Sequence, residues 1–235
     1  THTERGVSFT TVINGIYKAL QQGERELGVS FKLIMSYLRH LSEEAAFETL
    51  EQSKPYQEWI DGVGLDSSEL GNPPEKFEKV FQASAKMAYK LCAHAGEEGP
   101  AEYIWGSLNL LKVDRIDHGN RCLDDAKLVK HLAEIQMPLT LCPLSNLELK
   151  VIQNLKDSPL REMMQQNLLV TLNSDDPAYF GGYMNENLLA TAEALNLTID
   201  EVATLLKNGF KATWLDEEEK LGWCELIYEL ALSID

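Results

Sequence analysis

The chain has 235 residues, a formal net charge of −16 and 44% hydrophobic residues. Such an acidic surface repels phosphate backbones, which argues against nucleic acid as a partner, and no apolar run approaches the roughly 20 residues that cross a bilayer. No low-complexity segment or Pro/Gly linker divides the sequence, so we predict a single domain over residues 1–235.

The predicted elements begin with a helix over Thr10–Glu26, which Gly28 can cap. Short apolar runs then alternate with longer amphipathic stretches. Each run has four to seven residues and several are nearly continuous in apolar character, which is typical of parallel strands buried on both faces. The predicted strands, in chain order, are Phe31–Tyr37, Gly62–Leu65, Leu91–His94, Arg115–His118, Leu139–Cys142 and Leu168–Leu172.

Helix signals fill the segments between these strands. Ser42 is a predicted N-cap, and Pro73-Pro74 stands where the first turn of a helix tolerates proline. Strands that alternate with helices through short connections predict an α/β fold with a parallel sheet. The other predicted helices are Ala126–Gln136, Pro159–Asn167, Glu186–Leu195, Ile199–Lys207 and Asp216–Ile234.

Polar residues cluster just after five of the predicted strands. The C-terminal ends of barrel strands converge on one mouth, and that is where chemistry takes place. Five clusters at the same register are hard to explain as ordinary surface, so we predict a functional site there. The clusters are Asp66–Glu69, His94–Glu97, His118, Ser145-Asn146 and Ser174–Asp176.

The tetrapeptide His94-Ala95-Gly96-Glu97 combines a metal ligand with an acid. A neutral imidazole is a good zinc ligand, and Gly96 allows a sharp turn that points Glu97 back toward the same centre. A carboxyl group shielded from water can act as a general acid. Taken alone, the tetrapeptide favours a second interpretation, a strand-end histidine beside an exposed glutamate.

The segment Arg115-Ile116-Asp117-His118-Gly119 offers a second histidine. His118 could position or deprotonate a water molecule, or could be a buried histidine whose hydrogen bonds are satisfied. Asp117 could orient a neighbour or be a solvated charge.

Adjacent carboxylates occur in Ser174-Asp175-Asp176-Pro177. They repel each other unless a cation or a donor compensates, so one could ligate a metal while the other accepts a substrate proton. Asp before Pro is also a good helix N-cap, and both interpretations stay open. For Cys142 a buried free thiol is favoured over a metal ligand.

Other signatures are absent from the sequence. It has no P-loop, no dinucleotide-binding glycine pattern, no nucleophile elbow and no cytidine-deaminase motif. Its four cysteines are far apart and form no C-x-x-C pair, which indicates free thiols and a cytoplasmic location.

Taken together, four segments resemble the adenosine/adenine deaminase family of the metal-dependent amidohydrolase superfamily. They are His94–Glu97, Arg115–Gly119, Cys142–Asn146 and Ser174–Phe180, and the likeness runs from the first residues to about Leu215. The sequence looks more like the adenine deaminase group, because adenosine deaminases usually have Gly at position 117 and a Trp-Ser-Ser type of sequence at 144–146.

This resemblance implies a hydrolase with a (β/α)₈ TIM barrel of amidohydrolase type, present incompletely as about six of eight β/α units, and one Zn²⁺ per intact subunit. The implied reaction is hydrolytic deamination of adenine to hypoxanthine and ammonia in purine salvage. By position, His94 and Asp175 resemble zinc ligands, Glu97 the acid that protonates N1 of the purine, and His118 the residue that orients and deprotonates the attacking water.

The remaining carried-over roles concern the substrate, a small-molecule purine. Asp175 resembles a carboxylate that also accepts the proton of the water, and Asp176 resembles the residue that bonds N7. Ser68 and Glu69 correspond to a strand-end loop that touches the base in relatives. Homo-oligomers are compatible with the sequence, and no membrane or nucleic-acid partner is indicated.

One departure from the family pattern concerns the metal. The family's first strand carries His-x-His, which supplies two zinc ligands, and this sequence has no His-x-His. A catalytic zinc usually has three protein ligands or more. We therefore expect two further histidine ligands in a segment before Thr1, and we expect these 235 residues alone to bind zinc weakly and to have little activity.

Two alternative functions stay open. The first is deamination of adenosine or of an N6-modified adenine. The second is a metal-free barrel relative that binds purines or proteins without chemistry; the missing His-x-His favours it, and the retention of Glu97, His118, Asp175 and Asp176 opposes it.

Overall fold

The computed structural model describes residues 2–234 and divides into two compact units. Unit 1 contains residues 1–94 and 106–114, and unit 2 contains residues 95–105 and 115–235. None of the helices within residues 2–234 combines the length and apolar character that crossing a bilayer requires.

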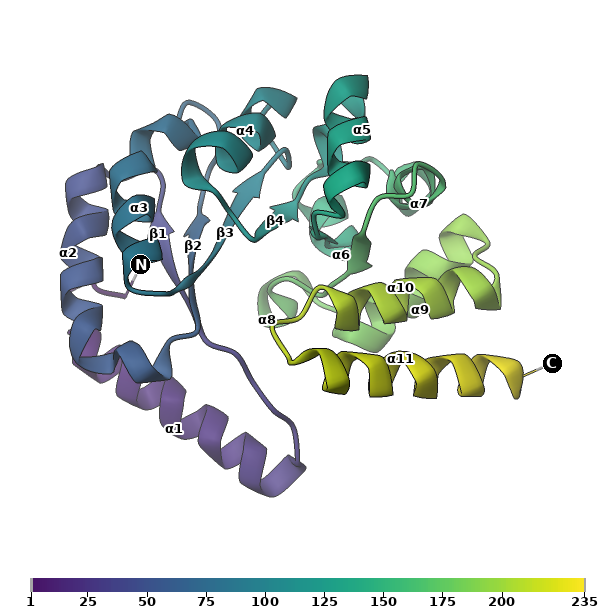
Figure 1. Ribbon diagram of the computed structural model, residues 1–235, viewed down its shortest axis with the longest axis horizontal. Coiled ribbons are helices and arrows are strands. Elements are labelled where there is room, and N and C mark those ends of the chain that lie inside the picture. Colours follow the sequence, from purple (N-terminus) through teal and green to yellow (C-terminus); the bar gives the residue numbers. More distant parts are fainter. Residues whose placement is uncertain (1, 235) are drawn as a thin grey trace. The chain divides into compact units, whose positions relative to one another are not determined.

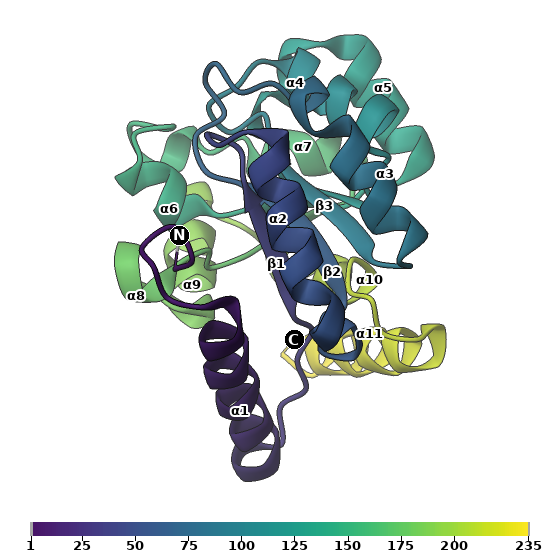
Figure 2. The same ribbon diagram turned by 90° about the vertical axis from the view of Figure 1, so that its left-hand side faces the viewer.

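Unit 1 is built on parallel strands covered by helices. Strand β1 pairs with β2 from Ile34↔Gly62 to Leu38↔Asp66, and β2 pairs with β3 from Gly62↔Lys90. Helices α2 and α3 run along these strands (Figures 1 and 2). The elements are α1 (Phe9–Leu27), β1 (Ile34–Leu38), α2 (Glu43–Ser53), β2 (Gly62–Asp66), α3 (Glu78–Lys86) and β3 (Lys90–Ala95), with short helical turns at Lys54–Trp59, Pro74–Phe77 and Ser107–Leu111.

Unit 2 repeats the same alternation. Strand β4 pairs in parallel with β5, and β5 pairs in parallel with β6. Helices α10 and α11 pack against each other at the C-terminal end of the chain (Figure 1). The elements are α4 (Ala101–Gly106), β4 (Arg115–His118), α5 (Ala126–Ile135), β5 (Leu139–Leu141), α6 (Pro143–Glu148), α7 (Leu160–Gln165), β6 (Val170–Leu172), α8 (Pro177–Phe180), α9 (Met184–Leu195), α10 (Ile199–Lys211) and α11 (Glu217–Leu232), with short helical turns at Asn120–Asp124 and Leu155–Asp157.

The predicted strands are all present, and β4 has the predicted bounds. The prediction was wrong at the start of the first strand, where residues 31–33 are not strand. Asp61 explains the difference, because its carboxylate accepts hydrogen bonds from the Leu33 backbone N–H and the Lys32 ammonium, both at 2.9 Å. The side chain replaces the ladder bond that a longer strand would make.

The predicted caps are confirmed at two helices. Gly28 follows α1 with a φ of 67°, and Ser42 accepts a hydrogen bond from the Ala45 N–H. At α10, Thr198 forms a capping box with Glu201 that was not predicted. The Thr198 N–H, followed by Arg161, lowers the pKa of Glu201. Local polar side chains therefore set several helix starts, as their sequence positions predict.

Short helices escaped prediction. The helices α4, α6 and α8 have six, six and four residues, too few to develop an amphipathic period. The predicted helix at Pro73-Pro74 begins as a short 3₁₀ turn before α3. Helix α6 matters most, because it carries two side chains of the site described next.

Candidate active site

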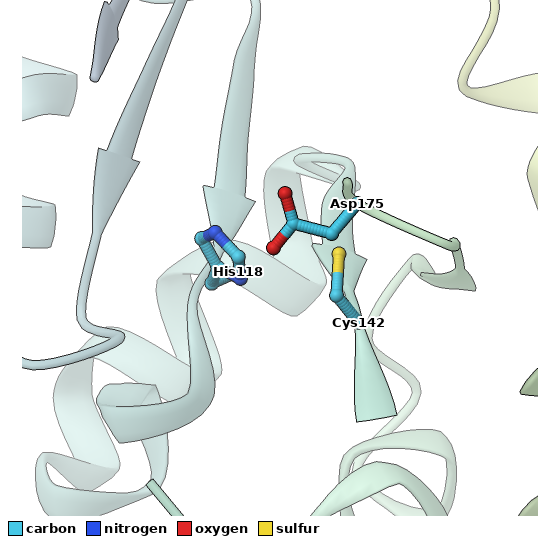
Figure 3. A group of neighbouring side chains, drawn as sticks. All are labelled: His118, Cys142 and Asp175. Carbon is cyan, nitrogen blue, oxygen red and sulfur yellow. The ribbon is translucent and has the colours of Figure 1, made fainter. Parts of the chain in front are cut away.

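Three side chains of unit 2 meet at the ends of consecutive strands. His118 is the last residue of β4, Cys142 follows β5, and Asp175 lies shortly after β6. Their ligand atoms all lie within 4.8 Å of one another, and Figure 3 shows them directed toward a common space. Because β4, β5 and β6 are parallel, their carboxyl ends bring these distant residues together, as the sequence predicts for His118 and Asp175.

The backbone turns sharply at two of these residues. His118 has a φ of 66° and Asp175 a φ of 55°, both in the left-handed region, and Gly119 continues the turn with a φ of 79°. Histidine and aspartate tolerate this region better than most residues, yet such positions cost on the order of 1–3 kcal/mol and cluster at functional sites. The turn at His118 ends β4 at that residue, whereas the turn at Asp175 lies in the segment after β6.

Glu97 reaches the same site from the loop after β3. Gly96 has a φ of 76°, and a Cβ atom there would lie 2.6 Å from Cδ1 of Ile104, so only glycine fits this turn. The Glu97 side chain is 9% exposed, and its Oε2 lies 3.5 Å from Nε2 of the buried His118. The predicted turn at Gly96 is therefore present, and the predicted acid and histidine face each other.

Two buried amides hold the Glu97 carboxyl group. The Asn146 side chain, on α6, donates to Oε1 of Glu97 at 3.0 Å. The Asn120 side chain donates in turn to Oδ1 of Asn146 at 2.9 Å. The Glu97 carboxyl group therefore has Oε1 at the Asn146 amide and Oε2 at the His118 ring.

Asp175 is fixed by a neighbouring hydroxyl group. Ser145, also on α6, donates to Oδ2 of Asp175 at 2.6 Å. Asp176 occupies the N-cap position of α8 but makes no capping hydrogen bond with its side chain, and it is exposed. The Asp176 side chain therefore does not cap α8, which was one of the two interpretations of this carboxylate pair.

The Asp117 carboxylate is held by the side chains of Arg115 and Thr140. Its Oδ1 lies 3.0 Å from Nε of Arg115 and accepts a hydrogen bond from the Thr140 hydroxyl at 3.2 Å. The Arg115 guanidinium in turn lies over the Trp214 ring, 4.8 Å from its centroid. Asp117 is therefore held in an ion pair and is not the freely solvated charge that the sequence left open.

Cys142 is a free, buried thiol, as expected. Burial, followed by the charges of Asp175, Glu97 and Asp117, raises the pKa of this thiol well above its usual range. Its sulfur lies beside the ligand atoms of His118 and Asp175, a position that is not predicted from the sequence.

The other predicted site residues belong to unit 1. Nδ1 of His94, at the end of β3, lies 3.4 Å from Oδ1 of Asp66, at the end of β2. In the loop after β2, Glu69 is 1% exposed, and the Ser68 carbonyl accepts a hydrogen bond from the Asn72 side chain at 3.2 Å. His94 and Asp66 therefore face each other at the ends of neighbouring strands, and the roles of His94, Ser68 and Glu69 remain predictions.

Three side chains of the unit 2 site have no role predicted from the sequence. Ser145 and Asn146 belong to a predicted strand-end cluster but without an assigned role, and Asn120 is not predicted at all. Each acts through a partner far along the chain, for example 49 residues from Asn146 to Glu97. The one local signal was Pro143, which can start a helix and would have placed Ser145 and Asn146 on its first turns.

The donor set of the unit 2 site fits a divalent transition metal. Imidazole nitrogen, thiolate sulfur and carboxylate oxygen are the ordinary ligands of zinc. His118, Cys142 and Asp175 provide one of each at a shared position.

Comparison with known proteins decides the family. The family model described as adenosine deaminase matches residues 1–230. The chain belongs to this family. The chain is 55% identical over 227 residues to an adenine deaminase of Wolinella succinogenes, which covers 97% of this chain and 69% of that protein.

Solved structures agree with this family membership. A crystal structure of an adenine deaminase from Arthrobacter aurescens matches with a TM-score of 0.94 and 44% identity, covering 97% of this chain and 70% of that one. An amidohydrolase from Burkhoderia ambifaria, solved with bound Zn, matches with a TM-score of 0.83 over 91% of this chain and 62% of that one; at 24% identity it shows the shared fold alone.

The predicted fold class and enzyme class are thereby confirmed. The chain carries six β/α units of an amidohydrolase-type (β/α)₈ barrel, and it is a deaminase-family hydrolase most similar, among the relatives named above, to adenine deaminases.

Proposed function

We propose that the intact enzyme catalyses the hydrolytic deamination of adenine to hypoxanthine and ammonia, in the cytoplasm and in the service of purine salvage. The observation that carries the proposal is that Glu97 lies beside His118, and His118 beside Asp175, at the strand ends of unit 2. The 55% identity to a relative named as an adenine deaminase supports adenine as the substrate.

We assign the metal as Zn²⁺, held by Asp175 together with His94. Both donor types suit zinc, and Ser145 keeps the Asp175 carboxylate oriented. When bound, zinc supplies Lewis acidity, which lowers the pKa of water from about 15.7 to about 7 and so makes hydroxide available at neutral pH.

The chain's own residues then move the protons. Glu97 delivers a proton from Oε2 to N1 of adenine, which relieves the negative charge that attack at C6 would place on the ring. Asn146 keeps Oε1 engaged, so that the proton has one defined position. The low exposure of Glu97 and His118 excludes bulk water, which strengthens these contacts.

His118 orients the attacking water and accepts its proton, and Asp175 serves as a second acceptor. The left-handed backbone at both residues is the local cost of pointing both side chains at one position. From the family resemblance we assign Asp176 to N7 of the base and Ser68 and Glu69 to further contacts with the base. The nitrogen leaves as ammonia, which balances the water consumed.

Ammonia release tests the proposal. The zinc-loaded protein is assayed side by side with adenine, adenosine and N6-methyladenine. The proposal expects adenine to be turned over with by far the highest kcat/KM. Preferred turnover of adenosine or N6-methyladenine moves the activity to those substrates, and release from none of the three, with zinc bound, contradicts deamination altogether.

A further inference from the structure

Cys142 is the one member of the unit 2 cluster that the proposed reaction does not use. The Cys142 sulfur and the ligand atoms of His118 and Asp175 all lie within 4.8 Å of one another. Ligands of one tetrahedral zinc ion lie roughly 3.3–3.8 Å apart, from metal–ligand lengths of about 2.0–2.3 Å. The three ligand atoms therefore need to approach one another by no more than about 1.5 Å to hold a cation.

We propose that His118, Cys142 and Asp175 form a second cation site that takes a thiophilic divalent cation, such as Cd²⁺ or excess Zn²⁺, and blocks the reaction when filled. The thiol distinguishes this site from the zinc position proposed above. Asp175 can serve both, because a carboxylate has two oxygens and can bridge neighbouring metal ions. Filling the site occupies His118, which is then lost to the attacking water.

The chemistry of the sulfur selects the cation. Cys142 is 5% exposed and its thiol donates only weakly, to the Thr140 carbonyl at 3.5 Å. As the sulfur–metal bond forms, the thiol proton leaves to solvent. Soft thiolate ligands favour zinc-like and softer ions over magnesium or calcium, which prefer oxygen. Mg²⁺ should therefore neither bind here nor inhibit.

Cadmium provides a probe with two readouts. CdCl₂ is titrated into the zinc-loaded full chain while the ultraviolet thiolate-to-metal charge-transfer absorption and adenine turnover are followed. Cys142→Ser should abolish the absorption and raise the Cd²⁺ concentration for half-inhibition by at least about tenfold, since changes to groups that merely support a ligand already lower metal affinity about 10–100-fold. Cys122→Ser is the matched control, because Cys122 is also a free and buried thiol of unit 2.

The inhibition rests on the proposed function, but the cadmium absorption does not, so the two readouts test the site and the function separately. A cadmium absorption that needs Cys142 but not Cys122 supports the site even if adenine is not turned over. Adenine turnover without such an absorption, or an absorption and inhibition that survive in Cys142→Ser, overturns the site alone. If Cys142→Ser does not fold, X-ray absorption on cadmium in the Cys122→Ser protein decides: one sulfur ligand supports the site, and only nitrogen and oxygen ligands overturn it.

Discussion

Replacing Asn146 by alanine isolates the hydrogen bond that orients the Glu97 carboxyl group. The Asn146 side chain is 2% exposed, donates to Glu97 at 3.0 Å and accepts from Asn120 at 2.9 Å. Truncation leaves both partners without this contact in a region that water reaches poorly. As Glu97 gives up its proton in the proposed reaction it becomes a carboxylate, and a hydrogen bond to a charged group contributes about 1.5–3 kcal/mol.

That free energy sets the expected loss of activity. At about 1.4 kcal/mol per tenfold change, Asn146→Ala should lower kcat/KM for adenine roughly 10- to 150-fold. Since Glu97 is proposed to act in the proton transfer, the loss should fall mainly on kcat and leave KM nearly unchanged. The same truncation should lower the free energy of unfolding by about 1–3 kcal/mol.

Asn120→Ala is the matched control. Asn120 is also a buried amide, 7% exposed, but it touches Asn146 and lies one step further from Glu97. Steady-state ammonia release gives kcat and KM, and urea denaturation gives stability. We expect similar stability losses and a clearly smaller loss of kcat for Asn120→Ala. Equal losses of kcat in the two variants would show that activity follows packing, and would contradict the proposal that Asn146 acts by orienting Glu97.

Three further outcomes follow from the same structure. Glu97→Gln should keep its zinc, measured by metal analysis, while kcat falls about 10²–10⁴-fold with the lost proton donor; an unchanged kcat removes Glu97 from its role. Gly96→Ala and Gly71→Ala both place alanine at a φ of 76°, but only the alanine at position 96 meets Ile104. Urea denaturation should therefore show that Gly96→Ala lowers the free energy of unfolding by ~1–3 kcal/mol more than Gly71→Ala does. Equal losses in the two variants would contradict the clash with Ile104. The folded-state pKa of Glu201 is lowered, so its contribution to stability is complete above its unfolded pKa of about 4.3 and is lost as pH falls through the folded value. Glu201→Gln should therefore lose less stability than the unmodified protein on acidification from about pH 5. Parallel plots of unfolding free energy against pH for the two proteins would argue against this role of Glu201.

The strands and the polar residues at their ends could be predicted because their signals are local. Nearly continuous apolar runs mark strands buried on both faces, and β4 ends at His118 as predicted. Parallel strands then bring residues at equivalent ends together, which is why His118 and Asp175 meet although 57 positions separate their numbers.

The supporting hydrogen bonds could not be predicted, because they join residues with no periodic relation. Ser145 reaches Asp175 across 30 residues and Asn146 reaches Glu97 across 49. Both depend on α6, a six-residue helix too short to leave an amphipathic pattern. The sequence correctly indicated that Cys142 is a free buried thiol, but its neighbours depend on how β5 is placed between β4 and β6.

A crystal structure of the zinc-loaded protein with hypoxanthine, the proposed product, would show whether Glu97, His118 and Asp175 surround one bound purine beside the metal. The account predicts that the Glu97 carboxyl group contacts N1 of the purine and that Asp175 ligates the metal beside C6. A purine bound away from Glu97 and His118, or zinc bound without Asp175, would contradict it.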